Sequence, residues 1–413
     1  MRNLRSEGPV IFLDSQMQGH PASSKSYIAA RPKRWIKSID DGIEIYEGDQ
    51  VRQEKGNPWG LLSRFWQKSW LFGYLGYDLK NHLEKLSSKN KAEVDVPDLY
   101  FMEPELILEL EEDGEAKTIK GKVPEIKSSE NISGEFHIKL ETQISEHEYK
   151  AKIKRAQQDI TEGEYYEINL SHPLVFEVTG DSLDLYQAMK QVGPVPFGAF
   201  LQLDDVSVCC ASPERFLARK GQRVWSQPIK GTASRAGHSA SDPAIETLLN
   251  SEKERAENLM IVDLVRNDLG RVALKNSVQV SDLFEIQTFE TVHQMVSTVE
   301  CTVSQQANSF DVIKACFPMG SMTGAPKIAA MKAIEELESY RRGIYSGAIG
   351  YIQPNGDFDF NVVIRSAIRE GRKLVYPTGG AITSDSDPEA EWEETLVKAQ
   401  ALTRILNNME SAE

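Results

Sequence analysis

The sequence lacks any long hydrophobic run: no stretch of about 18 apolar residues, the length of a membrane-spanning helix, occurs in its 413 residues. The first apolar patch, residues 10–13, is too short and too soon interrupted to be the core of a signal peptide. We therefore expect no membrane span and predict a cytoplasmic location.

Positive charge is also scarce. The chain has 47 Lys and Arg against 62 Asp and Glu, which gives a formal net charge of −15. Affinity for nucleic acid rests on clustered Lys and Arg, so nucleic acid is not an expected partner. A small anionic molecule remains compatible with this composition, because a few cationic groups inside one cleft can outweigh the overall field.

Cysteine is rare as well. Cys209, Cys210, Cys301 and Cys316 have neither the number typical of a disulfide framework nor the spacing of metal ligands. We expect them to be small buried apolar residues. Apolar residues make up 40% of the chain, which is ample for a large core in one big domain or in two closely packed subdomains.

Short capping signals indicate where helices begin. Ser145 with Glu148 forms a capping box, apolar residues then recur at helical spacing, and Gly163 ends the helix. Three further helix starts have signals of the same kind. They are Asp242-Pro243, Ser251 with Glu254, and Asp387-Pro388.

Short apolar segments between these helices are typical of strands. The segments are 10–13, 26–30, 70–77, 166–170, 223–226, 347–352 and 359–368. Strands and helices do not alternate as a repeated βαβ unit, so the pattern favours an α+β fold with largely antiparallel sheets. The weakly periodic stretch 111–146 is interpreted as an exposed hairpin region or a joint between subdomains.

Two predicted helices carry the same pair of carboxylates. Glu254 and Glu257 share one helix face, and Glu391 and Glu394 share another, with Lys398 one turn further along. Each pair alone is typical of a solvated helix surface. If the two pairs converge, however, their repulsion requires a cation, and hard oxygen ligands suit Mg²⁺.

Two loops could contribute to a site. Lys230, in QPIKGT, is either a turn lysine in water or an amine nucleophile, which would need desolvation or a cationic neighbour to lower its pKa. The segment 320–327, GSMTGAPK, lacks the Gly-Lys-Ser/Thr ending of a phosphate loop, so we do not expect nucleotide binding there. Its Ser321 and Thr323 hydroxyls could bind a carboxylate, or the segment could be a simple strand-to-helix turn.

Six segments, read together, resemble the chorismate-binding family that comprises aminodeoxychorismate synthase component I, anthranilate synthase component I and the isochorismate and salicylate synthases. In the family's order, they are SPERFL at 212–217, PIKGT at 228–232, AENLMIVDLVRNDLGRV at 256–272, FPMGSMTGAPK at 317–327, RGIYSGAIGY at 342–351 and DSDPEAEWEET at 385–395. The resemblance implies a two-subdomain sandwich with helices outside. Residues 1–144 would contribute strands to it, and 145–413 would form the chorismate-binding core.

The resemblance also implies roles for individual residues. Glu257 and Glu394 match direct Mg²⁺ ligands, and Glu254 and Glu391 match their water-mediated partners. Glu214 matches the general acid that protonates the departing C4 hydroxyl, against the alternative of an ordinary surface glutamate. Positions matching substrate contacts are Thr232, Ser321, Tyr345, Arg365, Gly379 and Lys398. The alternative for the arginine among them is a paired structural role.

Within the family, PIKGT discriminates between activities. Relatives that form anthranilate or isochorismate carry alanine at the position of Lys230, whereas aminodeoxychorismate synthases carry lysine. The resemblance therefore implies that chorismate and ammonia give 4-amino-4-deoxychorismate for para-aminobenzoate and folate synthesis. The amine would add at C2 as the C4 hydroxyl leaves, and ammonia would then enter at C4. The alternatives are an anthranilate synthase component I and a non-catalytic chorismate-sensing protein.

The family's usual ammonia source is a separate type-I glutamine amidotransferase subunit, so such a partner is expected. Nothing in the sequence resembles a Cys-nucleophile glutaminase domain or a pyridoxal-phosphate lyase.

Three positions depart from the family pattern. Gln294 stands where relatives carry histidine, although His293 is adjacent, and Glu167 stands where relatives have glutamine or lysine. The proline often found before Arg235 is missing. A glutamine amide offers both a donor and an acceptor, as imidazole does, so we expect Gln294 to contact the substrate.

Overall fold

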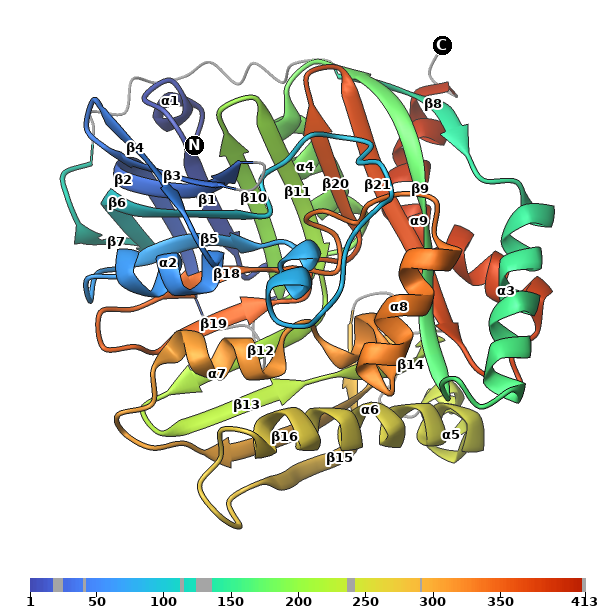
Figure 1. The fold of residues 1–413 in the computed structure, drawn as a ribbon. Helices are drawn as coiled ribbons and strands as arrows, with labels where there is room; N and C mark the ends of the chain where they lie inside the picture. Colours follow the sequence, from blue (N-terminus) through green and yellow to red (C-terminus); the bar gives the residue numbers. More distant parts are fainter. Residues whose placement is uncertain are drawn as a thin grey trace.

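The structure, a computed structural model, describes residues 1–17, 25–39, 42–111, 115–123, 136–235, 242–289 and 292–410, with side chains in the last helix up to residue 406 (Figure 1). The described strands pair into one continuous sheet of 21 strands, whose two parts on either side of β2 are called the first and the second sheet below. Every pair of named strands is antiparallel. The predicted α+β class with largely antiparallel sheets is confirmed.

The long strand β2 (Ser26–Ile39) joins the two sheets, because it pairs with β1, β3 and β6. The first sheet contains β3 (Gly42–Glu47), β4 (Gln50–Lys55), β5 (Leu71–Leu75), β6 (Leu99–Leu110), β7 (Ala116–Lys120), β12 (Arg215–Lys220), β13 (Arg223–Gln227), β14 (Ile229–Ser234), β15 (Gln279–Thr288), β16 (Val292–Thr302), β18 (Ala348–Ile352) and β19 (Phe358–Asn361). The second contains β1 (Val10–Asp14), β8 (His137–Gln143), β9 (Glu167–Thr179), β10 (Phe197–Leu203), β11 (Val206–Ser212), β17 (Gly324–Ala325), β20 (Ser366–Glu370) and β21 (Lys373–Ile382).

The largest hydrophobic cluster lies between the two sheets. It includes Phe101 of β6, Leu201 of β10 and Phe360 of β19, all almost fully buried. A second hydrophobic cluster covers the other face of the second sheet and includes Phe200 of β10. Neighbouring residues of β10 therefore point into different cores, which explains why its sequence reads as an apolar run. Burying each such side chain contributes about 1.5–3 kcal/mol.

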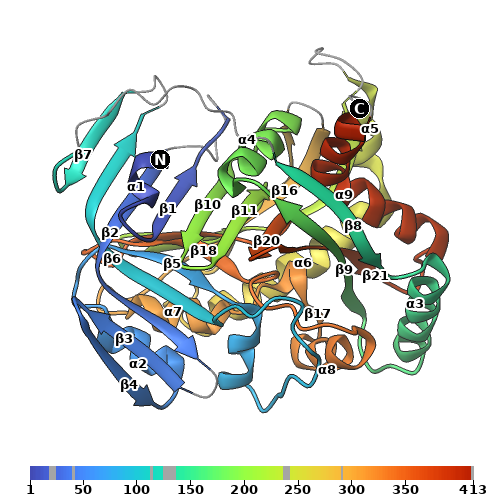
Figure 2. The same cartoon turned by 90° about the horizontal axis from the view of Figure 1, so that it is seen from above.

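Helices cover the outside of the sheets, as expected of the predicted sandwich. They are α1 (Arg2–Arg5), α2 (Pro58–Phe65), η1 (Tyr77–His82), α3 (Glu146–Thr161), α4 (Ser182–Val192), α5 (Pro243–Asn250), α6 (Glu252–Gly270), α7 (Ser309–Cys316), η2 (Gly320–Met322), α8 (Lys327–Leu337) and α9 (Pro388–Glu410). Seen from above, α4 and α9 lie beside the second sheet, whereas α6 packs on β16 of the first (Figure 2). In the described part of the chain, no helix is long and apolar enough to cross a membrane.

The predicted helix starts are confirmed at the level of single hydrogen bonds. The side chain of Ser145 accepts a bond from the backbone N–H of Glu148 at the start of α3. Ser251 caps α6 in the same way, with the N–H of Glu254 as donor. Asp242 and Asp387 cap the starts of α5 and α9. Two of these caps, at Ser251 and Asp387, begin the helices that carry the predicted carboxylates.

Two strand predictions were wrong in detail. The segment 359–368 is not one strand, because the chain leaves β19 after Asn361 and re-enters the sheet at Ser366. Arg365 lies in this break with φ at +50°, a left-handed conformation that is uncommon for a residue other than glycine. In the second case, the apolar alternation predicted at 166–170 starts too early, since Tyr166 is 67% exposed and β9 begins at Glu167.

The N-terminal segment is built into both sheets. Its strand β1 pairs with β10, and its strand β5 pairs with β18. A boundary at residue 144 stays a prediction. The stretch 111–146 lies partly outside the described residues. Its described part contains β7, which is mostly exposed and pairs with β6, and β8, which pairs with β9.

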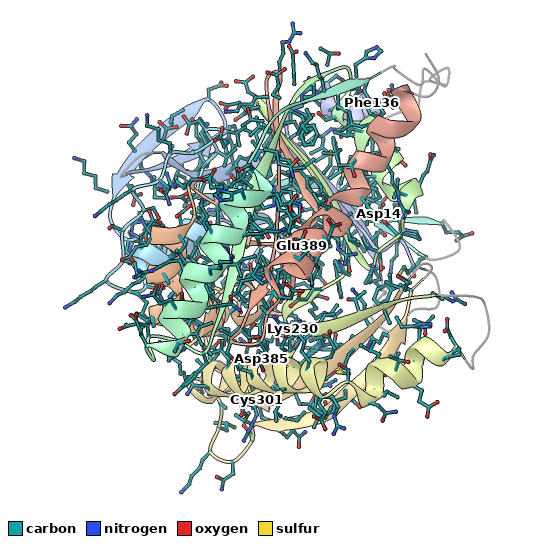
Figure 3. The ribbon with its side chains drawn as sticks, turned by 90° about the vertical axis from the view of Figure 1, so that its right-hand side faces the viewer. Asp14, Phe136, Lys230, Cys301, Asp385 and Glu389 are labelled. Carbon is teal, nitrogen blue, oxygen red and sulfur yellow. The ribbon has the colours of Figure 1, made fainter. Side chains whose placement is uncertain are left out.

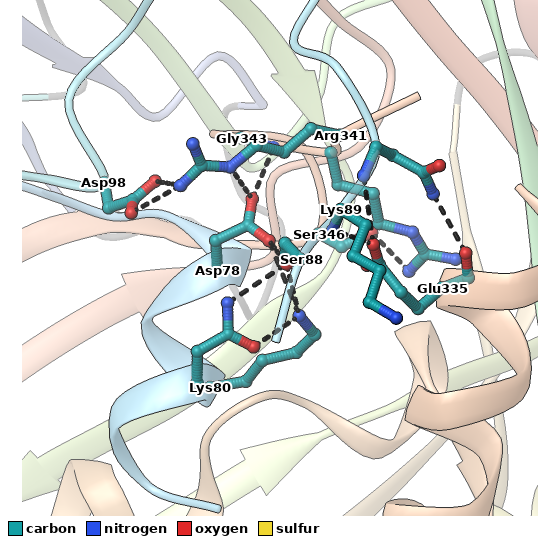
Figure 4. Close-up of polar contacts among 12 residues, drawn as sticks. Asp78, Lys80, Ser88, Lys89, Asp98, Glu335, Arg341, Gly343 and Ser346 are labelled. Atoms are coloured by element: carbon teal, nitrogen blue, oxygen red, sulfur yellow. Dashed lines mark hydrogen bonds and ion pairs between the residues drawn. The ribbon is translucent and has the colours of Figure 1, made fainter. Parts of the chain in front are cut away.

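A buried ionic network also joins the N-terminal segment to the rest of the chain (Figure 4). The carboxylate of Asp78 accepts hydrogen bonds from Ser88 and from the backbone N–H of Gly343, and it lies 3.1 Å from the guanidinium of Arg341. The same guanidinium donates to both oxygens of Asp98 at 2.7 and 2.8 Å. These bonds hold the loop that follows Arg341 in a fixed position.

All four cysteines are free and buried, as predicted.

Glycine substitutions test the tightness of this sheet packing. A Cβ on Gly350 of β18 would lie 2.1 Å from the backbone oxygen of Asp359, whereas a Cβ on the exposed Gly60 of α2 would meet no atom within 4 Å. Gly350→Ala should destabilise the protein by about 1–3 kcal/mol or more through overpacking. Gly60→Ala should stabilise it by about 0.5–1 kcal/mol. Thermal unfolding should lower the Tm of the first variant and raise that of the second; equal Tm values would contradict this packing.

Candidate active site

Lys230 lies on β14 and forms a buried ion pair with Glu167 at the start of β9. Its Nζ donates a hydrogen bond to Oε1 of Glu167 at 2.8 Å, and the two side chains are 11% and 1% exposed. Figure 3 places Lys230 in the interior, between the levels of α6 and α9. The alternative considered from the sequence, a turn lysine that points into water, is therefore wrong.

Several carboxylates determine the charge state of Lys230. Burial acts to lower its pKa, but Glu167, Glu257 and Glu394 outweigh that effect and raise the pKa above the ordinary value. These carboxylates therefore favour the ammonium form of the amine. A nucleophilic role requires that this proton be removed.

Glu214 is the second predicted catalytic residue, and it too is buried. Its Oε1 accepts a hydrogen bond from the Ser321 hydroxyl at 2.7 Å, so the predicted acid and a predicted substrate contact lie side by side. Burial raises the pKa of Glu214 to about 7, although the Ser321 bond and the charges of Lys230 and Arg365 oppose the shift. A carboxyl group that keeps its proton close to neutral pH can act as a general acid.

Gln294 occupies the position where relatives carry histidine. It pairs directly across the sheet with Thr232, and its Nε2 donates to the Thr232 hydroxyl at 3.5 Å. Its Oε1 is buried and has no hydrogen-bond partner among the described residues. His293 is next in the strand and points the other way, toward Thr288 and Asp242. Gln294, not the histidine, therefore faces Thr232.

The two predicted carboxylate pairs lie on helices that come together. Lys253 of α6 places its ammonium 3.8 Å from Glu257 of its own helix and 3.6 Å from Glu391 of α9. A cation thus already bridges the two helices at the position where a divalent cation is predicted. The sequence analysis missed this lysine because nothing in its local pattern indicates which helix it will face.

The four carboxylates differ in their electrostatic surroundings. Burial, the largest cause in each case, raises the pKa of Glu257 to about 7 and also raises the pKa values of Glu254 and Glu391. The pKa of Glu394 is lowered: burial opposes this, but Lys398 at 2.5 Å outweighs it. Within the described residues, no group of three or more His, Cys, Asp or Glu side chains is already arranged to hold a metal ion.

Two glycines leave room beside these carboxylates. A Cβ on Gly231 would lie 3.0 Å from Oε2 of Glu254, and one on Gly380 would lie 3.1 Å from Oε2 of Glu391. Gly379 is also a predicted contact residue, and its carbonyl oxygen accepts a hydrogen bond from Lys398 at 2.9 Å. The absence of side chains at these glycines keeps the space next to both acidic pairs open.

Arg365 and Tyr345 approach the site from the loops that follow β19 and α8. Among the described residues, no hydrogen bond or ion pair joins the Arg365 guanidinium to another group. The alternative of a paired structural arginine is therefore not supported. Its electrostatic neighbours are Tyr376 and Glu214. A guanidinium that has no ion-pair partner among the described residues and lies near Glu214 is suited to binding an anionic substrate group.

Tyr345 is held by a buried network that the sequence analysis did not anticipate. Arg342 forms an ion pair with Glu338 at 2.6 Å, and its guanidinium also donates to the carbonyl oxygens of Met322 and Asn169 and to the Ser346 hydroxyl. One guanidinium thus ties α8, η2 and β9 together immediately before Tyr345. In the sequence, only the RGIYSG segment indicated that this region belongs to the site, and it did not indicate the partners of Arg342.

In the segment 320–327, the lysine side chain is hydrogen-bonded within the protein. Lys327 donates to Asp268 of α6 at 2.5 Å and to the carbonyl oxygens of Cys316 and Pro318. The Thr323 hydroxyl donates to backbone oxygens within its own turn. Of the two hydroxyls considered in this segment, only that of Ser321 contacts another site residue.

Comparison with known proteins assigns this arrangement to a family. A family model described as chorismate binding enzyme matches residues 9–404. The chain belongs to the chorismate binding enzyme family.

Relatives in the chorismate binding enzyme family have two different names. An aminodeoxychorismate synthase of Streptomyces griseus is 45% identical over 63% of this chain and 36% of its own length. Aminodeoxychorismate synthase component 1 of Klebsiella aerogenes is 31% identical over 99% of this chain and 95% of its own. Anthranilate synthase component 1 of Aquifex aeolicus is also 31% identical, over 98% and 90%. The chain thus spans about a third of the Streptomyces protein and nearly all of the other two.

Solved structures of the family share the fold. Anthranilate synthase component I of Streptococcus pneumoniae superposes with a TM-score of 0.79 at 28% identity, covering 93% of both chains. A menaquinone-specific isochorismate synthase of Escherichia coli gives a TM-score of 0.73 at 17% identity, covering 96% of this chain and 88% of its own. Overall similarity in sequence and fold therefore does not distinguish aminodeoxychorismate synthases from anthranilate or isochorismate synthases. Individual residues have to make that distinction.

The environment of Glu214 leads to a prediction about its protonation. Glu214 should titrate near pH 7, and Ser321→Ala should raise its pKa further, because the lost hydrogen bond stabilises the carboxylate. Carbon-13 NMR of labelled glutamate side chains would follow the titration, with Glu214→Gln identifying the signal. A Glu214 signal that titrates near its ordinary value of about 4.3 would contradict the effect of burial.

Proposed function

We propose that this protein is an aminodeoxychorismate synthase component I, which converts chorismate and ammonia to 4-amino-4-deoxychorismate for para-aminobenzoate and folate synthesis. The observation that supports this most strongly is the buried Lys230, enclosed by carboxylates and close enough to Glu214 for their charges to interact. The resemblance implies that an alanine at this position accompanies the formation of anthranilate or isochorismate.

The side chains of the site support a two-step displacement. The Lys230 amine would add at C2 of chorismate while the C4–O bond breaks, and Glu214 would supply the proton with which the hydroxyl leaves as water. Ammonia would then form a bond at C4 while the bond from C2 to the lysine breaks. The amino group is in this way directed to C4, para to the ring carboxylate.

Substrate binding would use the remaining predicted residues. The Arg365 guanidinium and the Lys398 ammonium would attract the carboxylates of chorismate, and Tyr345 would contact them from its buried loop. Thr232, Ser321 and Gln294 would supply hydroxyl and amide groups, and the backbone of Gly379 would complete the contacts. The partnerless Oε1 of Gln294 is an acceptor that a substrate hydroxyl could satisfy.

We further propose that the enzyme requires Mg²⁺. The donor set fits this ion, since Glu254, Glu257, Glu391 and Glu394 offer hard oxygen ligands from two facing helices between which Lys253 already places a cation. Bound there, Mg²⁺ would neutralise negative charge on the substrate as a Lewis acid. Glu257 and Glu394 would bind it directly and the other two through water.

The proposed ammonia source is a type-I glutamine amidotransferase subunit. The Klebsiella aerogenes and Aquifex aeolicus relatives both carry the name component 1, which implies a second component in those proteins. In this chain, the partner stays a proposal.

Anthranilate synthase component I is the second candidate, favoured by the Aquifex aeolicus relative with its equal identity. Lys230 opposes it, since without such an amine ammonia would attack C2 directly. The non-catalytic alternative suggested by Gln294 and Glu167 predicts no turnover at all.

Replacing Lys230 tests the assignment. Lys230→Ala should reduce the formation of 4-amino-4-deoxychorismate by roughly 10³-fold or more, because the nucleophile is lost, while chorismate still binds. Lys230→Arg should not restore activity, since a guanidinium keeps its proton. Products formed from chorismate at saturating Mg²⁺ and ammonium would be identified by mass spectrometry. Wild-type rates in the alanine variant would rule out the covalent route, and anthranilate from the unmodified protein would rule out the assignment.

Removing the metal tests the carboxylate site. Chelation with EDTA should abolish turnover, and Glu257→Gln or Glu394→Gln should weaken Mg²⁺ binding measured by calorimetry, because a neutral amide replaces a charged ligand. Glu252→Gln, at an exposed position in the first turn of the same helix, is the matched control and should bind Mg²⁺ normally. Full activity in EDTA would contradict the proposal.

A further inference from the structure

The pairing of Lys230 with Glu167 has a chemical consequence for the proposed function. An ammonium nitrogen has no lone pair and cannot attack carbon, so the proposed nucleophile must first transfer a proton to an acceptor. Among the described residues, Glu167 provides the carboxylate that is hydrogen-bonded to Nζ, at 2.8 Å. Glu257 and Glu394 affect Lys230 electrostatically, but neither forms an ion pair with it within 4.0 Å in the described structure.

The carboxylate of Glu167 has unused capacity as an acceptor. Only Oε1 is engaged, by Lys230; Oε2 is buried and has no hydrogen-bond partner within the described residues. A buried ion pair that served structure alone would be expected to satisfy both carboxylate oxygens, because a buried oxygen without a partner costs about 1–3 kcal/mol. Oε2 of Glu167 is therefore an acceptor that the described structure leaves unused beside the amine.

The backbone holds Glu167 rigidly in this position. Glu167 pairs with Ala325 of β17, and a Cβ on the adjacent Gly324 would lie 2.1 Å from the backbone oxygen of Glu167. The strand can therefore approach the turn after η2 only because residue 324 is a glycine. A base fixed in this way stays within hydrogen-bonding distance of the amine throughout a reaction.

We propose that Glu167 is a catalytic base that takes a proton from the Lys230 ammonium before the amine attacks chorismate, and returns it when the amine departs. This inference rests on the proposed aminodeoxychorismate synthase activity and adds a residue to its machinery.

The protons balance over the cycle. Transfer from Lys230 leaves a neutral amine and a protonated Glu167. The amine adds at C2 while the C4 hydroxyl leaves with the proton of Glu214, so the adduct nitrogen carries a positive charge. Ammonia adds at C4, the C2–N bond breaks, and the electron pair returns to the lysine as a neutral amine. Glu167 then gives its proton back to Lys230, and the new C4 ammonium reprotonates Glu214.

The variant Glu167→Gln tests proton transfer without a large change in the shape of the side chain. The amide has nearly the size of the carboxylate and can still accept a hydrogen bond from Lys230, but it cannot take up the proton. We expect kcat to fall about 10²- to 10⁴-fold, with the KM for chorismate changed only a few fold. Glu167→Asp keeps a carboxylate one methylene further away and should retain more activity than the amide variant.

Chemical rescue supplies the readout that a structural role would not affect. Glu167→Ala leaves a space beside Lys230, and added formate should restore part of its activity in a concentration-dependent way by acting as the missing base. Glu177→Gln is the matched control on the same strand, where the side chain is 43% exposed and pairs with Arg372; its rate should equal that of wild type, with or without formate. Thermal unfolding of each variant would show that it is folded.

The outcomes are distinguishable from failure of the proposed function itself. Wild-type kcat in a folded Glu167→Gln variant would overturn the role of Glu167 as a base, even if Lys230→Ala remained inactive. Loss of activity in Glu167→Ala without rescue by formate, together with equally low activity in Glu167→Asp, would also overturn it in favour of a structural ion pair. If Lys230→Ala is fully active, the proposed function fails first.

Discussion

Repulsion among buried carboxylates is the physical constraint on which the site depends. Acidic side chains converge there from β9, α6 and α9, and burial makes their negative charge costly. Lys230, Lys253 and Lys398 each form an ion pair with one or more of them. The carboxylates around Lys230 outweigh the effect of burial and favour its protonated form.

The sheets determine how this convergence is possible. Glu167 begins β9 in one sheet, whereas Lys230 lies on β14 in the other, and the two meet because the sheets pack face to face around a common core. Glu214 and Ser321 meet in the same way, from a β11–β12 turn and from η2. Such pairs join parts of the chain that are far apart in sequence, so their geometry depends on the packing of the whole molecule.

The sequence was sufficient to predict features whose signal is local or whose motif is complete. Caps such as Ser145 and Ser251 act within one helical turn, and the helix boundaries followed from them. Most of the predicted site residues came from the six ordered motifs. Those that lie outside these segments are Glu254, Gln294, Arg365, Gly379 and Lys398. The partners of these residues could not be predicted, because a side chain such as Lys253 or Arg342 gives no local indication of which distant group it will meet. The break at Arg365 escaped notice because a left-handed arginine has no distinctive neighbours in the sequence.

The connection of the N-terminal strands to both sheets also affects how the chain can fold. Leu71 of β5 pairs with Ile352 of β18, and Ile11 of β1 pairs with Leu201 of β10, so early strands await partners that are synthesised much later. Contacts of such long sequence separation slow folding, and they leave apolar strand edges uncovered in the meantime. On a ribosome, the first hundred residues would emerge as β-rich chain without most of their core. Protection of those edges during synthesis is therefore a requirement that this topology imposes on the cell.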